Sequence, residues 1–422
     1  MESIARLESE VRGYVRSFPT VFTQSRNAHL WDEQGRQYID FFAGAGTLNY
    51  GHNHPRIKAA LLEHIQQDGL LHGLDLATRA KIRFLETFED VILVPRQLNY
   101  RLQFTGPTGT NAIEAAIKVA RKAKSRSHVV AFTNAYHGHS LGSLALTGNR
   151  RYHNEHYGSH NNVSHLPFDG YFGAGTDTAA QLRKLLQDGS SGLPHPAAIV
   201  LETIQAEGGI NVASDDWLRA VRAICDDFDI AMIVDDIQVG NGRTGPFFSF
   251  ETAGIRPDIV CLSKAIGGGL PMSLVLIDPE LDVWQPGEHT GTFRGNQLAF
   301  VAANAALPLW REDTFTHQLK RNAANVETHL GALAKQHGLP PPRGRGMIWG
   351  LCLPNQTSAD AVTQACFEHG LIMETAGAEG NVLKFLAPLT IEHDTLLRGL
   401  EILEYALQQC APIHDDTRVA IP

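Results

Sequence analysis

The sequence predicts an α/β protein with a large, mostly parallel sheet domain and a smaller α+β domain. Four short apolar runs, each followed by polar or glycine residues, are typical of strands buried on both faces; they lie at 129–132, 197–201, 230–234 and 259–262. Three helical patterns lie between or before these strands, at 112–122, 179–188 and 215–228. This alternation of strands and helices favours parallel strand–helix–strand units.

Composition sets broad limits on function. The chain has 422 residues, of which 43% are hydrophobic and 19% charged, so it is long enough for two or three lobes. A net charge of −9 without a long basic run argues against nucleic acid or an anionic membrane as partner. No apolar stretch approaches the ~20 residues of a membrane span, and the charged N-terminus lacks the core of a signal peptide. Five cysteines match neither a disulfide framework nor a zinc site, which favours a cytoplasmic location.

The N-terminal third begins with a helical pattern and an extended piece. Residues 28–42 then predict a β-hairpin with its turn at 33–35, and residues 56–92 predict two helices. Between them, His52 and His54 form a His-x-His pair that precedes Pro55. Such a pair can bind a metal, but no third ligand lies near it in the sequence. We therefore expect a structural turn and no metal site.

A turn of small residues, 106–111, precedes the helix at 112–122. Free backbone N–H groups at a helix N-terminus, together with the helix dipole, bind phosphate well. An alternative is a simple N-cap by Thr108 or Thr110, completed by Glu114, and both interpretations can hold together. The turn is not a nucleotide-binding P-loop, because no Gly-Lys-Thr closes it.

The strongest chemical signal is an acid and a lysine that follow two neighbouring strands. Asp235 and Asp236 come directly after the run 230–234, and Ser263-Lys264 follow the run 259–262. In open α/β sheets, ligands bind beyond the carboxyl ends of the strands. A buried lysine loses its charge readily and can form a Schiff base, and an acid can keep a pyridine nitrogen protonated. Lys264 and Asp235 therefore match the needs of pyridoxal 5′-phosphate (PLP), the alternative being a turn residue and a solvated lysine.

The residues around this pair resemble the signature of the class III, or omega, aminotransferases. The matching segments are Ile-Val-Asp-Asp-Ile-Gln, Gly-Arg-Thr-Gly and Ser-Lys-Ala-Ile-Gly-Gly-Gly-Leu-Pro-Met, at 233–238, 242–245 and 263–272. The resemblance runs from about residue 26 to about residue 395. It implies the PLP-dependent aspartate-aminotransferase-like fold (fold type I). It also implies an N-terminal segment 1–45 near the entrance, a PLP-binding domain 46–310 and a small domain 311–422.

The resemblance also implies roles for individual residues. Lys264 and Asp235 are the expected catalytic residues, and Lys264 is the expected proton carrier of a ping-pong cycle. The implied cofactor-binding residues are Gly109 and Thr110 at the phosphate, Tyr136 stacked on the ring, Asp235 at the ring nitrogen, Gln238 at the ring hydroxyl, and Lys264. In the family, the residue that matches Thr292 bonds the phosphate of the neighbouring subunit's cofactor. A homodimer or higher homo-oligomer, with its active site at the subunit interface, is therefore expected.

Three residues are expected at the substrate. Glu207 lies in a segment similar to the family's Glu-Pro-x-Gln-Gly-Glu-Gly-Gly, with Thr203 and Ala206 as departures. In relatives such as ornithine aminotransferase, an arginine binds the α-carboxylate of the keto acid, and Lys384 takes that place here. Lysine lacks the two-pronged grip of arginine. Either Lys384 or Arg294, which replaces a family glycine, is therefore expected to bind this carboxylate.

The remaining segments predict structure more than chemistry. Residues 149–196 predict loops around one short helix, with irregularly spaced histidines interpreted as solvated: His153, His156, His160, His165 and His195. Beyond the lysine, the chain predicts a long helical stretch at 298–336, a strand at 347–353 and helices at 358–370 and 393–409. The tail from residue 411 to 422 is expected to be frayed.

Finer motifs resemble the diaminobutyrate–2-oxoglutarate aminotransferases, and among them the ectoine-pathway type. They lie at 17–22, 41–52, 72–78, 106–112 and 291–296. The resemblance implies amino transfer from glutamate to aspartate 4-semialdehyde, which yields L-2,4-diaminobutyrate. A turn after Lys264 that is shorter than in the ectoine-type enzymes leaves the pathway open. Alternatives are an omega-aminotransferase for another diamine or ω-amino acid, a PLP isomerase or racemase, and a cofactor-less binding protein.

Overall fold

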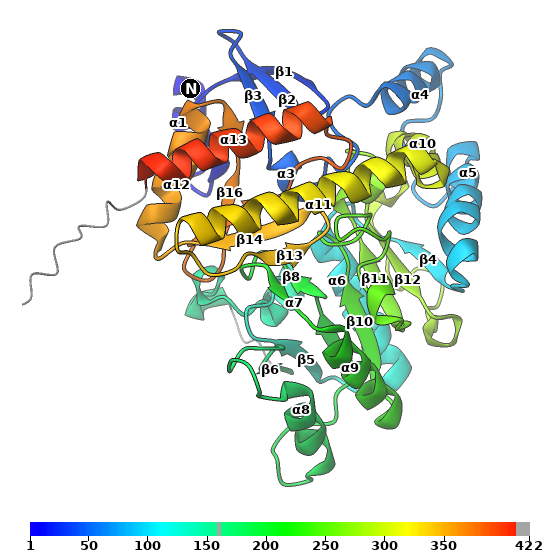
Figure 1. Ribbon diagram of the computed structural model, residues 1–422. Coiled ribbons are helices and arrows are strands. Elements are labelled where there is room, and N and C mark those ends of the chain that lie inside the picture. Colours follow the sequence, from blue (N-terminus) through cyan, green and yellow to red (C-terminus); the bar gives the residue numbers. More distant parts are fainter. Residues whose placement is uncertain (158–161, 411–422) are drawn as a thin grey trace, which may run out of the picture.

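A computed structural model describes residues 1–157 and 162–410 of the chain. Its largest element is a seven-stranded sheet in the lower half of the view (Figure 1). The strand order is β4 (Arg101–Phe104), β12 (Leu274–Ile277), β11 (Ile259–Leu262), β10 (Ala231–Asp235), β7 (Ala198–Leu201), β5 (Val129–Phe132) and β6 (Val163–Leu166). Strand β12 runs antiparallel to both of its neighbours, β11 and β4, whereas the other adjacent pairs of this sheet are parallel, so the predicted mostly parallel sheet is confirmed.

Both faces of this sheet are buried, as the continuous apolar runs predict. In β10, Met232 and Val234 belong to one apolar core, whereas Ala231 and Ile233 belong to another on the opposite face. Helix α9 packs in the first core and α6 in the second. The helices of this part are α4 (Pro55–Gln66), α5 (Arg79–Phe88), α6 (Gly109–Lys124), α7 (Leu141–Leu146), α8 (Thr178–Gln187), α9 (Asp215–Asp227) and α10 (Gln297–Ala306).

A smaller lobe of two four-stranded sheets lies above the large sheet (Figure 1). In one sheet, the strand order is β13 (Arg343–Arg345), β14 (Ile348–Cys352), β17 (Val382–Phe385) and β16 (Glu374–Ala376), and neighbouring strands are antiparallel. The other orders β1 (Phe22–Arg26), β2 (His29–Asp32), β3 (Gln37–Asp40) and β15 (Leu371–Ile372). Helices α11 (Asp313–Gln336), α12 (Gln356–Glu368) and α13 (His393–Cys410) pack with them.

The N-terminal hairpin and the C-terminal lobe share one sheet. The predicted hairpin is confirmed as β2 and β3, and β15 pairs parallel to β3, with Leu371 opposite Ile39. The first helical pattern forms two separate helices, α1 (Glu2–Leu7) and α2 (Tyr14–Ser17). The domain boundaries at 45/46 and 310/311 stay a prediction.

Two segments differ from the sequence-based expectation. The helical stretch at 298–336 is interrupted by a 3-10 turn, Leu307–Arg311, because Pro308 lacks the N–H that a continuous α-helix needs. Within 149–196, strand β6 and short 3-10 turns occur beside α8, so the prediction of one helix among loops was incomplete. His156, His165 (in β6) and His195 are exposed as expected, whereas His153 is half-buried. His160 and the tail 411–422 lie outside the described residues.

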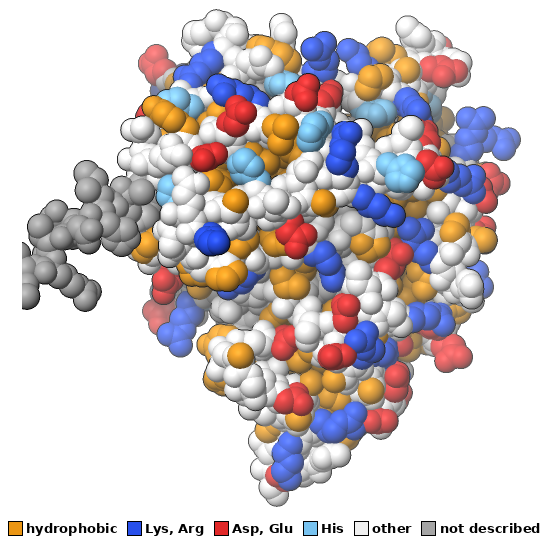
Figure 2. Space-filling model, viewed as in Figure 1, with side chains coloured by type: hydrophobic (Ala, Val, Ile, Leu, Met, Phe, Trp, Pro, Cys, Tyr) orange, Lys and Arg blue, Asp and Glu red, His pale blue; other side chains and the backbone are white. Residues whose placement is uncertain are grey.

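The visible surface carries acidic and basic side chains interspersed, with apolar side chains in small groups between them (Figure 2). In the described ranges, no helix is long and apolar enough to cross a membrane. The same ranges hold no group of three or more histidine, cysteine or acidic side chains that could hold a metal ion.

Arg243 joins the large sheet to the smaller lobe. It lies in the turn after β10 and is fully buried. Its guanidinium donates to the carbonyl oxygens of Met347, at 3.0 Å, and Ala387, and to the side-chain oxygen of Asn49. Because a guanidinium is rigid and planar and carries several N–H donors, this one side chain satisfies acceptors from three segments of the chain.

We expect Arg243→Ala to lower the free energy of unfolding by about 3 kcal/mol or more, because it leaves three buried acceptors unpaired. Urea unfolding followed by circular dichroism measures this change. Arg183→Ala is the control: Arg183 pairs with Asp227 at the surface, so its loss costs about 1 kcal/mol or less. Equal losses of unfolding free energy in the two variants would contradict the role of Arg243 in joining the large sheet to the smaller lobe.

Candidate active site

The carboxyl ends of the parallel strands meet at a cavity of about 500 Å³. Chain segments from the ends of β10, β11, β5 and β7 contribute Asp235, Lys264, Tyr136 and Glu202. The cavity is also lined by Tyr14, Ala45, Thr108, Gly109, Thr110, His137, Gly138, His139, Tyr152, Glu207, Ile237, Gln238 and Val239. The expected acid and lysine, which lie 29 positions apart in the sequence, are thus brought to one cavity.

Lys264 extends into this cavity from the start of a short 3-10 helix, Lys264–Gly267. Its backbone is left-handed, with φ of 47°, which is uncommon for a residue with a side chain. Its amine donates to the carbonyl oxygen of Ala45 at 2.8 Å. Burial lowers the pKa of Lys264, while the charge of Glu207 opposes this shift. A lysine with a lowered pKa is a better nucleophile at neutral pH.

The turn that receives Lys264 is itself unusual. Ala43, Gly44, Ala45 and Gly46 all have positive φ, between 47° and 85°. Asp40 holds the start of this turn by accepting from the backbone N–H groups of Phe42 and Ala43, at 2.9 and 2.7 Å. This geometry aims the Ala45 carbonyl at the cavity, where it also accepts from Gln238 Nε2 at 2.8 Å.

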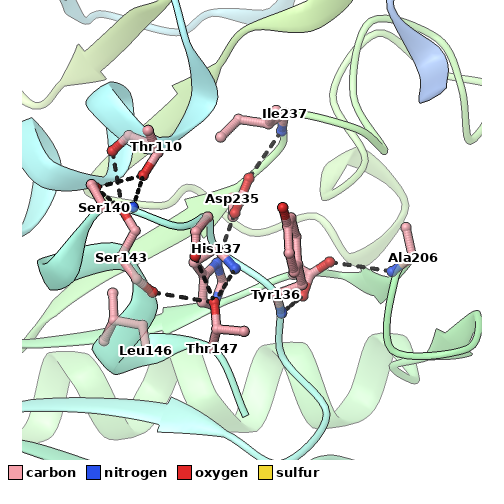
Figure 3. A network of polar contacts seen from close by, with 12 residues as sticks. Thr110, Tyr136, His137, Ser140, Ser143, Leu146, Thr147, Ala206, Asp235 and Ile237 are labelled. Atoms are coloured by element: carbon pink, nitrogen blue, oxygen red, sulfur yellow. Dashed lines mark hydrogen bonds and ion pairs between the residues drawn. The ribbon is translucent and has the colours of Figure 1, made fainter. Parts of the chain in front are cut away.

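Asp235 is held by a histidine that the sequence analysis did not single out. His137 Nδ1 lies 2.7 Å from Asp235 Oδ2, and both side chains are buried (Figure 3). Burial alone lowers the pKa of His137, but its hydrogen bond to Asp235 and the charge of that carboxylate outweigh burial and raise it. The other Asp235 oxygen accepts from the Ile237 backbone N–H at 3.2 Å. The pair keeps an acid oriented at the cavity wall.

The small-residue turn leads into α6 as predicted, and Thr108 caps the helix by accepting from the Asn111 N–H. Glu114 does not complete this cap, because it accepts from the Ser140 hydroxyl at 2.6 Å and the Gly142 N–H at 2.9 Å. Ser140 in turn lies 2.6 Å from the hydroxyl of Thr110 (Figure 3).

These contacts bring the loop after β5 against the first turn of α6. Gly138 has φ of +125°, and a Cβ there would lie 2.6 Å from the Thr110 hydroxyl, so only glycine permits this approach. The backbone N–H groups of Gly109 and Thr110, in the first turn of the 16-residue helix, therefore border the cavity together with a hydroxyl. This arrangement suits a phosphate.

Glu207 and Lys384 form an ion pair at the opposite wall. Lys384 is completely buried in β17, and its amine lies 2.7 Å from Glu207 Oε1 and 2.8 Å from Glu374 Oε1. Burial lowers the pKa of Lys384, but the two carboxylates outweigh it and raise that pKa. Conversely, burial raises the pKa of Glu207, and Lys384 and Lys264 outweigh it and lower the value to about 2. Both groups of the pair are therefore ionised.

Glu202 is a buried acid of a different kind. Its two carboxylate oxygens accept from the backbone N–H groups of Tyr136, at 3.0 Å, and Ala206, at 3.2 Å. Burial and the charge of Asp235 raise the pKa of Glu202 to about 8, while His137 opposes the shift. Glu202 is therefore largely protonated at neutral pH and adds little negative charge to the cavity.

Three of the expected site residues do not line this cavity: Lys384, which lies behind Glu207, Thr292 and Arg294. Thr292 is exposed in a 3-10 turn, Thr292–Gly295. Arg294 pairs with Asp75 and donates to the His289 carbonyl at 3.1 Å, in a separate cavity of about 290 Å³. Within one chain the structure therefore brings Gly109, Thr110, Tyr136, Glu207, Asp235, Gln238 and Lys264 together, with Lys384 directly behind Glu207.

Several residues at this site escaped the sequence analysis. His137 directly follows the expected ring-stacking residue Tyr136, and Glu202 opens the segment that holds Glu207, so both had a signal. Tyr14 and Glu374 had none, because no motif surrounds either residue and only folding brings them to the same wall.

The residues present fit a pyridoxal phosphate. The buried oxygen Oε1 of Gln238, which lines the cavity, has no hydrogen-bond partner among the described residues and can accept from a ring hydroxyl. Asp235 supplies an acid for a ring nitrogen, α6 a phosphate cradle, and Lys264 an amine. A bound cofactor would give these buried polar groups hydrogen-bond partners, without which their burial is energetically unfavourable.

Comparison with known proteins points the same way. The class III aminotransferase model matches residues 12–407. A diaminobutyrate–2-oxoglutarate transaminase from Wolinella succinogenes is 58% identical, with 96% of each chain covered. One from Halomonas elongata is 53% identical, covering 96% of this chain and 98% of the relative.

Solved structures share the fold. The ornithine aminotransferase of Toxoplasma gondii superposes with a TM-score of 0.84 at 25% identity, covering 97% of this chain and 94% of that one. A further crystal structure of that enzyme, with the same TM-score and identity, covers 93% of it and reports partial occupancy of PLP at its active site. N-acetylornithine aminotransferase from Stenotrophomonas maltophilia has a TM-score of 0.76 at 26% identity and 97% and 99% coverage. With a family model matched over nearly its whole length, the chain belongs to the class III aminotransferases.

Proposed function

We propose that this protein is an L-2,4-diaminobutyrate:2-oxoglutarate 4-aminotransferase, which makes diaminobutyrate from aspartate 4-semialdehyde and glutamate. The observation that carries the proposal is the identity of 48–58% over nearly the full chain to relatives with that name. The cavity supports it, because it joins a nucleophilic lysine, a buried acid and a phosphate cradle. The resemblance of the motifs at 17–22, 41–52, 72–78, 106–112 and 291–296 to the ectoine-pathway enzymes favours a role in ectoine biosynthesis.

The cofactor of this proposal is PLP. When bound, PLP supplies an electron sink that stabilises the carbanion formed when a proton leaves the substrate carbon. Gly109 and Thr110 would hold its phosphate, Asp235 its ring nitrogen and Gln238 its hydroxyl, and Tyr136 would lie against the ring. His137 fixes Asp235 through the 2.7 Å contact, so the acid keeps one orientation.

Lys264 would take the proton that leaves the substrate carbon on its amine and later return it. Its lowered pKa leaves a fraction of the amine neutral, so it can act as a base and then return the proton as an acid. The Ala45 carbonyl holds the resting amine at 2.8 Å in the cavity. Protonated Glu202 keeps further negative charge away from Asp235.

We expect the amine specificity of a single half-reaction to test this function. The purified, PLP-loaded protein is mixed with L-2,4-diaminobutyrate, ornithine, 4-aminobutyrate or glutamate, and the absorbance of the bound cofactor near 410–430 nm is followed. Bleaching by diaminobutyrate and by glutamate, reversed by 2-oxoglutarate, is the expected result. Lys264→Ala is the control, and it should lower the rate by about 10³-fold or more because it removes the nucleophile and base.

Other outcomes identify other functions. Bleaching only by another amine would retain an aminotransferase and reject diaminobutyrate. No bleaching by any amine, with the absorbance band present, would favour an isomerase. Absence of the band from protein purified and incubated with PLP would reject a PLP enzyme.

Lys384 is proposed as the cation that binds the α-carboxylate of glutamate. It lies directly behind Glu207 at the cavity, whereas Arg294 is paired with Asp75 outside the cavity of its own chain. We expect Lys384→Gln to raise the KM for glutamate by about tenfold or more, since a buried charge-assisted contact is lost. Steady-state kinetics with 2-oxoglutarate and glutamate measure this. A larger increase in Arg294→Ala would assign the role to Arg294.

A homodimer is proposed from an exposed apolar surface around Thr292. Two adjacent segments, 70–76 and 293–297, are joined by backbone hydrogen bonds, such as Gly73 N–H to the Gly295 carbonyl at 3.0 Å. Large apolar side chains stay exposed on them, by 45–66%: Leu70, Leu71, Leu74, Leu76 and Phe293. Contiguous apolar surface of this kind is typical of a subunit interface. This supports a contribution of Thr292 to the partner's phosphate site.

We expect Phe293→Asp to dissociate the dimer toward a 46.2 kDa monomer, because it places a charge in the apolar interface. Size-exclusion chromatography with light scattering measures the mass. The control is Phe172→Asp, at an equally exposed aromatic elsewhere on the chain, which should leave the dimer intact. A dimer that survives Phe293→Asp unchanged at micromolar concentration would place the interface elsewhere.

A further inference from the structure

Glu374 is a buried carboxylate beside the site that neither the motifs nor the comparisons assign. It lies in β16 directly opposite Lys384 in β17, and the two form a cross-strand pair. Glu374 Oε1 lies 2.8 Å from the Lys384 amine, and Oε2 accepts from the Tyr14 hydroxyl at 3.1 Å. Only 8% of Glu374 is exposed, so this position is not an ordinary solvated acid.

The pair of carboxylates around Lys384 does not balance in charge. Glu207 and Glu374 share the single ammonium of Lys384. Burial raises the pKa of Glu374 and the charge of Lys384 opposes this shift, so Glu374 takes up a proton more readily than an exposed carboxyl group does. Lys264 adds no fixed positive charge, because its pKa is lowered and its amine is committed to the cofactor in the proposed function. With both acids ionised, one negative charge is uncompensated, and either a proton on Glu374 or a cation from the substrate removes the cost of that buried charge.

The geometry decides where this charge acts. Glu374 and Lys384 lie behind the wall, whereas Glu207 and Tyr14 line the cavity itself. Because Glu374 shares the Lys384 ammonium from behind, part of the negative charge of Glu207 stays directed toward the cavity. Burial, followed by the charges of Glu374 and Glu207, raises the pKa of Tyr14, so its hydroxyl stays protonated as the donor that orients Glu374.

We propose that Glu374 is a positioning residue for specificity, which acts through Glu207 to select amino donors that carry a second ammonium group. The inference rests on the proposed function and deepens it. L-2,4-diaminobutyrate presents its 4-amino group to the cofactor and keeps a charged α-ammonium on a carbon farther from the reaction. That ammonium supplies the missing positive charge, and attraction between such groups is strong in a buried site.

The test compares two donors that differ in this group alone. 4-Aminobutyrate is diaminobutyrate with a hydrogen in place of the α-ammonium. The ratio of their half-reaction rate constants is measured in the PLP-loaded wild type and in Glu374→Gln, which keeps the side-chain shape and removes the charge. We expect the ratio of diaminobutyrate to 4-aminobutyrate to fall about tenfold or more, mainly through slower reaction of diaminobutyrate. A purely structural role would lower both rates together and leave the ratio unchanged.

The matched control is Glu379→Gln, which removes an exposed carboxylate five positions further along the same lobe. The ratio of its rate constants for diaminobutyrate and 4-aminobutyrate should equal that of the wild type. If Glu374→Gln does not fold, donor binding with Glu374 intact decides: calorimetric dissociation constants for the two donors, measured on PLP-loaded Lys264→Ala, must favour diaminobutyrate by about tenfold. Equal constants would overturn the inference.

The outcomes separate the inference from the proposed function. A wild type that reacts with diaminobutyrate, while Glu374→Gln keeps its donor ratio, overturns only the role of Glu374. A wild type that reacts with other amines and not with diaminobutyrate overturns the proposed function and this inference together.

Discussion

Burial of both faces of the central sheet is the constraint on which the rest of the structure depends. Alternate residues of every inner strand enter one of two apolar cores, so neither face can hold a polar group at low cost. The carboxyl edge is the place where side chains can be polar and still be held by a rigid frame. Asp235 and Lys264 lie there because the chain leaves the sheet at those positions, and the site therefore follows from the fold.

Charge at this edge is stabilised by pairs and not by solvent. Asp235 has His137, Lys384 has Glu207 and Glu374, and Glu202 stays largely protonated because burial raises its pKa to about 8. In each arrangement, short polar contacts offset the cost of desolvation, because such contacts are strong in the low-dielectric interior. The consequence is a cavity whose charge is set by the protein and changes little until a substrate brings its own.

The sequence could predict those features that depend on local pattern. Continuous apolar runs predicted β5, β7, β10 and β11, and the small-residue turn predicted the start of α6. The edge strand β6 was missed because its sequence, Val-Ser-His-Leu, is short and neither continuously apolar nor alternating. The role of Glu374 could not be predicted, because this acid is placed beside Lys384 only by the pairing of β16 with β17. The same limit applies to Tyr14, which meets the site across 360 positions of sequence.

The substitution of lysine for the family's arginine gains a physical reason from these contacts. A guanidinium has a planar fork that matches one carboxylate in two-pronged fashion, whereas an ammonium is a compact charge with three separate donors. Lys384 donates a hydrogen bond to Glu207 on one side and forms an ion pair with Glu374 on the other, from a position with no exposed surface. One compact cation is thus shared by two acids. The second acid gives the wall a place where the positive charge of a substrate ammonium group can be balanced, in addition to the lysine that can meet a carboxylate.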